Sequence, residues 1–120
     1  MTKPRNSTKK GISVEKRSDI VMAKVFFSDS PEGKVRPCIV LSDERYNSQG
    51  FALVAPITTA GDDYCLPIEK SDCDCEMARG SGARFDGIAK VPSSQIKHRI
   101  GRVKDEFYWE LISKIRELIE

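Results

Sequence analysis

Apolar and polar positions alternate in short runs along most of this chain, which is the pattern of half-buried β-strands. The runs that predict strands are residues 19–27, 36–41, 51–57, 64–68 and 84–91. Segments rich in Gly, Pro, Ser and Asp separate these runs, as expected for turns. Residues 96–101 fit either a brief strand or a turn, and residues 69–82 are a long connection without an evident element.

The spacing of apolar residues changes after Lys104, where a period of three to four residues begins. This period predicts an amphipathic C-terminal helix with apolar positions at Phe107, Leu111, Ile115 and Leu118. Asp105 is placed to cap this helix, and Glu106 suits the positive end of its dipole. Residues 42–47 could hold a short helical turn. Several short strands followed by one helix predict a small β-barrel with the helix packed on it.

Two prolines refine the prediction of the strands. Pro37 has no N–H to donate, so we expect it at the first residue of its strand, with Arg36 held just outside the sheet. Pro56 places the third strand at an edge of the sheet or near a bulge. In the fifth strand, the alternation of side chains puts Arg84 and Asp86 on the same side.

The length and composition are typical of one soluble domain, with 120 residues of which 32% are charged. No apolar run approaches the roughly 20 residues that a bilayer-spanning helix needs. The first residues carry charge instead of the apolar stretch of a secretory signal. We therefore expect a cytoplasmic protein without a membrane partner.

Charge is unevenly distributed along the chain. Residues 1–17 carry six basic residues against Glu15, a net charge of +5, although the whole chain carries only +2. We expect residues 1–17 to be a disordered basic tail, either simply solvated or able to seek a polyanion, and residues 18–120 to form the domain. A second basic cluster, opposed within its span only by Asp86, consists of Arg84, Lys90, Lys97, Arg99, Arg102 and Lys104.

The four cysteines do not predict a metal site. Cys38 lies in an apolar run and is expected to be a small buried residue. One residue separates Cys73 from Cys75, whereas zinc knuckles have two to four, and no second pair or nearby histidine accompanies them. We expect free thiols, no metal and no cofactor.

Polar side chains near the ends of three predicted strands could form a phosphodiester site that needs no metal. They are Arg36 before the second strand, Thr58 and Thr59 after the third, and Arg84 and Asp86 on the fifth. A carboxylate can take the proton of a ribose 2′-hydroxyl, and arginines and hydroxyl groups can stabilise the charge that develops on the phosphate. The same residue types also occur as a solvated strand end, turn threonines and a surface ion pair, so the spacing alone leaves both interpretations open.

Three motifs in the same order strongly resemble those of the MazF/PemK/Kid ribonuclease toxins. They are residues 18–21 (SDIV), 34–42 (KVRPCIVLS) and 54–59 (VAPITT). In addition, Arg84-Phe85-Asp86 is similar to the Arg-x-Asp of the Kid branch. The resemblance runs from about residue 18 to residue 118, nearly the whole predicted domain. It departs from the family where residues 28–34 lack the histidine of Kid and where Gly87 replaces a common glutamine.

The resemblance implies an SH3-like barrel of the CcdB/MazF/Kid toxin type that forms a homodimer. It further implies the toxin of a type II toxin–antitoxin system, with a cognate antitoxin as partner. The implied activity is a metal-independent endoribonuclease that cleaves single-stranded RNA by 2′-hydroxyl attack and leaves a 2′,3′-cyclic phosphate.

The resemblance also assigns site residues. The catalytic residues carried over from the family are Arg36, Thr58, Arg84 and Asp86. The residues expected to bind RNA are Lys34, Thr59, Lys90 and Lys97. The alternative is a non-catalytic member of the fold, either a CcdB-like topoisomerase inhibitor or a nucleic-acid-binding protein.

Overall fold

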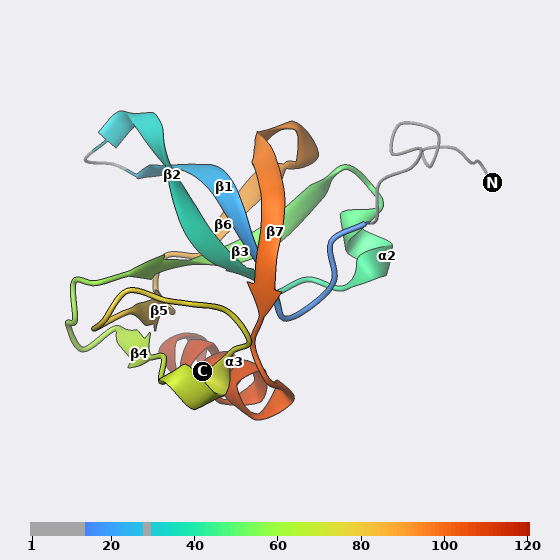
Figure 1. Ribbon diagram of the computed structural model, residues 1–120. Coiled ribbons are helices and arrows are strands. Elements are labelled where there is room, and N and C mark those ends of the chain that lie inside the picture. Colours follow the sequence, from blue (N-terminus) through green and yellow to red (C-terminus); the bar gives the residue numbers. More distant parts are fainter. Residues whose placement is uncertain (1–13, 28–29) are drawn as a thin grey trace.

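The computed structural model describes residues 14–27 and 30–120 and shows a mainly β fold with one long C-terminal helix (Figure 1). The strands are β1 (Asp19–Phe27), β2 (Ser30–Val40), β3 (Phe51–Thr58), β4 (Cys65–Pro67), β5 (Gly82–Arg84), β6 (Ala89–Pro92) and β7 (Ile96–Arg102). The helices are α2 (Glu44–Asn47), α3 (Asp105–Ile119) and the short 3-10 helices η1 (Lys70–Asp72) and η2 (Ser93–Gln95). The predicted short helical turn and the C-terminal helix are thus confirmed, and the ambiguous segment near residue 96 is a strand.

All strand pairs are antiparallel, and they follow the order β4-β5-β3-β2-β1-β7, with β6 also paired to β3. In the part of the chain that the structure describes, β7 pairs with neither β4 nor β6, so the sheet does not close. The sheet is nevertheless strongly curled, and Figure 1 shows β1, β2, β3, β6 and β7 wrapped around a common interior. The architecture is therefore barrel-like, as predicted.

The β1–β2 hairpin is longer than the sequence pattern predicts. β1 has the predicted bounds, but β2 begins at Ser30, and both Arg36 and Pro37 lie within it. Arg36 pairs with Ala23 of β1, so the prediction that Arg36 stands outside the sheet is wrong. Pairing of β2 with β3 begins only at Cys38, so Pro37 lies beyond the end of that ladder, where a missing N–H donor is tolerated. Residues 28–29 of the predicted turn lie outside the described residues.

Pro56 lies in a central strand, so the edge position offered for β3 is wrong. On one side Pro56 pairs with Cys38 of β2. On the other side β6 pairs only with the first half of β3, and β5 pairs with Ile57 and Thr58. Pro56 falls between these two partners, where the absence of its N–H breaks no ladder bond.

The predicted fifth strand is two strands. β5 ends at Arg84 and β6 begins at Ala89, and the residues between them form a turn. Phe85 is buried in the core, and its N–H donates to the Tyr64 carbonyl at 2.9 Å, which fixes the start of this turn. Asp86 therefore lies in a turn, and the prediction that strand alternation places it on the same side as Arg84 is wrong.

Two clusters of buried side chains hold the fold together. One fills the space between the sheet and α3 and includes Ile39, Ile57, Phe107 and Leu111. The other lies inside the curled sheet and is built from Val21, Ala23, Val25, Cys38, Val40, Ala52, Val54 and Val91. The two clusters account for the continuous apolar runs at the end of β2 and in β3, because both faces of these strands are covered.

The start of α3 differs in detail from the prediction. The N-cap position is Lys104, which makes no side-chain cap bond, so Asp105 is the first helical residue and not the cap. Asp105 and Glu106 occupy the first turn, where negative charge is favourable. The Tyr108 hydroxyl donates to the Leu41 carbonyl at 2.6 Å and ties the helix to the end of β2.

Residues 14–17 lead into β1 and are held by specific bonds. The buried Asn47 side chain donates to the Glu15 carbonyl at 2.7 Å, and the Lys16 N–H donates to the Asp19 carboxylate at 2.8 Å. These residues belong to the predicted basic tail, whose remaining residues 1–13 lie outside the described part of the chain. None of the described helices is long and apolar enough to cross a membrane.

Candidate active site

A hollow of about 360 Å³ opens where the pairing of β2 and β3 ends. Three of the polar residues predicted for the site line it: Arg36 from β2, Thr58 from the end of β3, and Thr59 directly after it. Arg36 and Thr58 are half-buried and Thr59 is exposed. The Thr58 hydroxyl accepts a bond from the Ala60 N–H at 3.2 Å, which keeps this turn close to the strand.

The strand register explains why the two motifs meet. Cys38 of β2 pairs with Pro56 of β3, and the same register continued by two residues sets Arg36 opposite Thr58. Thr58 in turn pairs with Gly82 of β5, so Arg84, two residues further on, projects from the same face of the sheet. Arg36, Thr58 and Arg84 therefore share one face, although only the first two line the hollow.

The rest of the hollow is mainly apolar, with Met22, Pro37, Ile57, Met77 and Ile100 in its lining. Its acidic lining residue is Glu76, an exposed side chain from the long connection between η1 and β5. The sequence reasoning did not select Glu76, because no motif includes it. The one available signal was that a long connection in a small domain often carries function.

Arg84 and Asp86 form an ion-pair cluster with Asp62, and none of the three is among the lining residues of this hollow. The Arg84 guanidinium donates to Asp86 at 2.8 Å and to Asp62 at 2.5 Å. Its hydrogen bond holds the pKa of Asp62 below the usual range of an aspartate, and the two carboxylates raise the pKa of Arg84. A guanidinium with a raised pKa keeps its proton, so Arg84 acts as a fixed positive charge.

Gly87 allows the Arg84 side chain to lie against the sheet. A Cβ atom at position 87 would stand 3.2 Å from Cγ and Cδ of Arg84 and 3.5 Å from Cγ of Pro56. Gly87, which stands where the family commonly has a glutamine, therefore leaves room for the aliphatic part of the Arg84 side chain next to Pro56 of β3.

The other basic residues selected from the sequence lie outside the hollow. Lys34 is exposed on β2, and Lys97 is exposed on β7. Lys90 on β6 is exposed, with its ammonium group 4.0 Å from the centre of the Phe51 ring. These side chains are available at the surface, but the structure does not gather them at one point.

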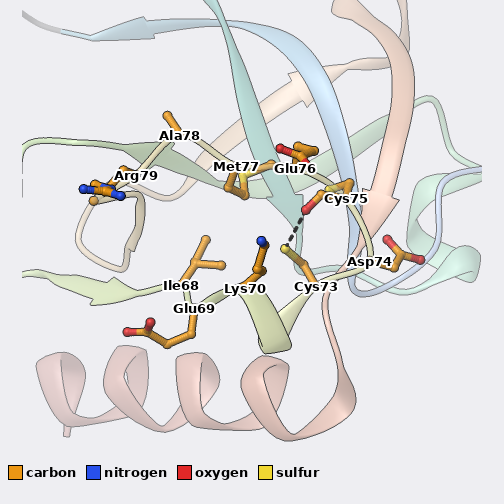
Figure 2. Close-up of a pocket in the computed structure, with 11 residues that line it drawn as sticks. Ile68, Glu69, Lys70, Cys73, Asp74, Cys75, Glu76, Met77, Ala78 and Arg79 are labelled. Carbon is orange, nitrogen blue, oxygen red and sulfur yellow. Dashed lines mark hydrogen bonds between the residues drawn. The ribbon is translucent and has the colours of Figure 1, made fainter.

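A second hollow, of about 620 Å³, borders the first and is shown in Figure 2. It shares Glu76, Met77 and Ala78 with the Arg36 hollow. Figure 2 shows Lys70 and Cys73 on one side of it, facing the strap of residues 75–79 on the other. The strap is anchored by Asp74, whose carboxylate accepts the Arg102 N–H of β7 at 2.7 Å.

The thiols near this second hollow are not disulfide-bonded. All four cysteines are free, and Cys73 Sγ donates to the Cys75 carbonyl at 3.3 Å. Burial is the main cause that raises the pKa of Cys75 to about 11, so this thiol is protonated at neutral pH. Within residues 14–27 and 30–120, no group of three or more His, Cys, Asp or Glu side chains could hold a metal ion.

Comparisons with known proteins show which family this chain is similar to. The family described as PemK-like, MazF-like toxin of type II toxin–antitoxin system matches residues 16–119. A curated relative, the probable endoribonuclease MazF of Mycolicibacterium smegmatis, is 30% identical over 77 residues, which are 61% of this chain and 69% of the relative.

Two solved structures illustrate the shared fold. MazF from Deinococcus radiodurans aligns with a TM-score of 0.71 at 16% identity, over 89% of this chain and 97% of that chain. An endoribonuclease from a mycobacterial species, solved in complex with its cognate antitoxin, aligns with a TM-score of 0.69 at 11% identity, over 86% of this chain and 92% of that chain. The family match covers the sheet, the Arg36 hollow and all of α3, so this chain belongs to the PemK-like, MazF-like toxins of type II toxin–antitoxin systems.

Proposed function

We propose that this toxin is an endoribonuclease that cleaves single-stranded RNA at the Arg36 hollow without a metal ion. The observation that carries the proposal is the meeting of Arg36 and Thr58 at one hollow, from two strands that the register aligns. A cation and a hydroxyl donor fixed side by side suit an anionic phosphate whose charge grows in the transition state. The name of the curated relative, a probable endoribonuclease, supports the same reaction class.

In the proposed reaction the ribose 2′-oxygen attacks the neighbouring phosphorus and the bond to the 5′-oxygen breaks. Asp86 accepts the 2′-hydroxyl proton as general base, and the products are a 2′,3′-cyclic phosphate and a 5′-hydroxyl. Arg36 stabilises the charge on the phosphate oxygens, and Thr58 donates a hydrogen bond to them. Arg84 orients Asp86 through their 2.8 Å ion pair. The raised pKa of Arg84 makes it a poor proton donor, which leaves solvent to protonate the 5′-oxygen.

Surface lysines and a partner copy complete the proposal. Lys34, Thr59, Lys90 and Lys97 are exposed and would contact the RNA backbone, which contributes salt-dependent affinity. The active form is a homodimer, and the cognate antitoxin binds it and blocks access to RNA. The support for the antitoxin is the family itself and the related endoribonuclease solved in complex with its antitoxin.

The decisive experiment compares Arg36→Ala with Arg45→Ala, a matched loss of an exposed arginine on α2. Cleavage would be followed in single turnover, and affinity would be measured with a 2′-O-methyl RNA that cannot be cut. We expect Arg36→Ala to lower the cleavage rate about a hundredfold or more, with a much smaller change in affinity. The Arg45→Ala variant should cleave like the parent protein.

Two further variants identify the base. Asp86→Asn should lower the cleavage rate strongly, whereas Glu76→Gln should have little effect if Glu76 only lines the hollow. The reverse result would move the base to Glu76 and leave the reaction class unchanged. A parent protein that cuts no single-stranded RNA would overturn the proposed activity in favour of a non-catalytic member of the fold.

A further inference from the structure

Trp109 on α3 lies at the surface in an unusual polar setting. Its side chain is 53% exposed, and it is the only tryptophan of the chain. The ring makes an edge-on contact with the buried Tyr108 at 4.9 Å between ring centres. The Arg17 guanidinium lies 5.5 Å from the Trp109 ring centre and 5.7 Å from that of Tyr108. Arg17 therefore joins residues 14–17 to the face of the helix that carries the exposed ring.

A hollow of about 260 Å³ lies beside this ring. Arg17 and Arg102 line it together with Trp109, and its acidic lining residue is Asp105. The Arg102 guanidinium is held in place, because it donates to the Arg17 carbonyl at 3.0 Å and to the buried Asp19 carboxylate at 3.5 Å. The site thus offers an aromatic face flanked by two arginines, one of which is fixed by the fold.

Charges of both signs surround this site, because Asp105 lines it with Arg17 and Arg102, and Glu106 and Glu110 flank Trp109 in the sequence of α3. Lys16 precedes Arg17 in the chain, and Lys104 precedes the first residue of α3. The sequence of residues 1–13, which leads into this segment, contains four basic residues and no acidic one. An aromatic stacking face flanked by two arginines is typical of sites for single-stranded nucleic acid, where bases stack on the ring and arginines contact the backbone.

The site is connected to the candidate active site by neighbouring hollows. The Trp109 hollow shares Arg102 and Asp105 with a hollow beside Asp74. That hollow shares Cys73 and Asp74 with the one drawn in Figure 2, which in turn borders the Arg36 hollow. Along β1 the positions opposite Arg36 and Arg102 are Ala23 and Asp19, about 13 Å apart at the usual rise per residue. One RNA strand can therefore reach both ends.

We infer that Trp109, Arg17 and Arg102 form an accessory site for single-stranded RNA, in which one base stacks on Trp109 and the two arginines contact the flanking phosphates. The choice of RNA as the ligand rests on the proposed function. The site is distinct from the residues proposed for cleavage, so it would contribute to affinity and to the placement of the strand and not to the chemical step.

The fluorescence of Trp109 reports on this site directly, because no other tryptophan contributes. A 2′-O-methyl oligouridine, which cannot be cut, would be titrated into the full-length protein. We expect saturable quenching of the tryptophan emission that weakens with added salt. Arg17→Gln should weaken the quenching and the affinity several-fold, whereas Arg45→Gln on α2 should not.

A second measurement uses labelled oligouridine and fluorescence anisotropy with Trp109 variants. Trp109→Leu should lower the affinity about tenfold, and Trp109→Phe, which keeps an aromatic face, should recover most of the loss. Trp109 is half exposed, so these variants are expected to fold, which thermal unfolding would check. The rate of cleavage at saturating RNA should stay near that of the parent protein.

Three outcomes would overturn this inference. They are an affinity of Trp109→Leu equal to that of the parent, emission that RNA leaves unchanged, and emission that changes only with protein concentration or added antitoxin. The last would mean that a protein covers the ring. Cleavage of RNA without quenching would reject this site and leave the proposed activity intact. Quenching without cleavage would support the site and reject the proposed activity.

Discussion

Cys38 sits in the interior of the curled sheet, two residues from Arg36. Its side chain is fully buried, and its Sγ donates to the Arg36 carbonyl at 3.5 Å. Burial disfavours the thiolate and raises the pKa of Cys38 to about 12, despite the nearby Arg36. Cys38 is therefore a small apolar residue that fills the core on the strand that also carries Arg36, and its neutral thiol is not suited to act as a nucleophile.

This burial predicts a loss of stability at alkaline pH. In the unfolded chain the thiol ionises near its ordinary value of about 8.5. Because the pKa is raised in the folded state, the contribution of the neutral thiol to the free energy of unfolding is complete below the pKa of the unfolded chain. It is lost as pH rises from there toward about 12. Urea unfolding at pH 7 and pH 10 should show that the parent loses about 2 kcal/mol more than Cys38→Ala over this range. An equal loss in both proteins would contradict the assignment.

At the scale of elements, local patterns predict the strands and helices whose bounds are set by their own sequence. The apolar period of α3 and the bounds of β1 are examples, and both are confirmed. The division of the predicted fifth strand into β5 and β6 was missed, because it depends on β3 having two different partners along one edge. The start of β2 was missed for a similar reason. Its pairing with β1 continues from Pro37 back to Ser30, whereas its pairing with β3 stops at Cys38.

The residues of the candidate site also fall into those that the sequence predicts and those that only the fold reveals. Arg36 and Thr58 belong to motifs that a sequence displays, and the register brings them together. Glu76 and Trp109 were not selected, because Glu76 lies in a connection without a motif and Trp109 reads as one more apolar position of a helix. Only the fold shows that Glu76 reaches the hollow and that Trp109 is exposed beside Arg17.

The packing of α3 on the sheet should dominate the stability of this element. Leu111 is fully buried in the cluster between sheet and helix, and Ile119 on the same helix is 79% exposed. Leu111→Ala should destabilise the protein by about 2–5 kcal/mol, because it removes buried methyl groups and leaves a cavity. Ile119→Ala is the matched control and should change the free energy of unfolding by no more than about 0.5 kcal/mol. Urea denaturation of the two variants would test this, and similar losses would mean that α3 does not pack as described.

At the scale of the whole molecule, an apolar strip leads from the β1–β2 hairpin to the candidate active site. Val35 pairs with Lys24, so it shares a face with Phe26, and the two apolar side chains are 49% and 57% exposed. Along the same face, Met22 and Pro37 form the next pair and line the Arg36 hollow. A partner copy seated on this strip would lie beside the hollow, which links the proposed homodimer to the proposed activity.

The dimer proposal is tested by a charge placed on this strip. Val35→Asp puts a carboxylate opposite Lys24, which the isolated hairpin tolerates, but burying that charge in an interface costs free energy. We expect the parent protein to sediment at twice the 13.5 kDa of one chain at tens of micromolar, and the variant to dissociate at least tenfold more readily. Ile119→Asp adds the same charge to an exposed apolar residue at the end of α3 and should leave the dimer intact. A parent that sediments as a single chain would refute the dimer. If both variants weakened the dimer equally, the added charge and not its position would cause the loss, and the β1–β2 face would not be the interface.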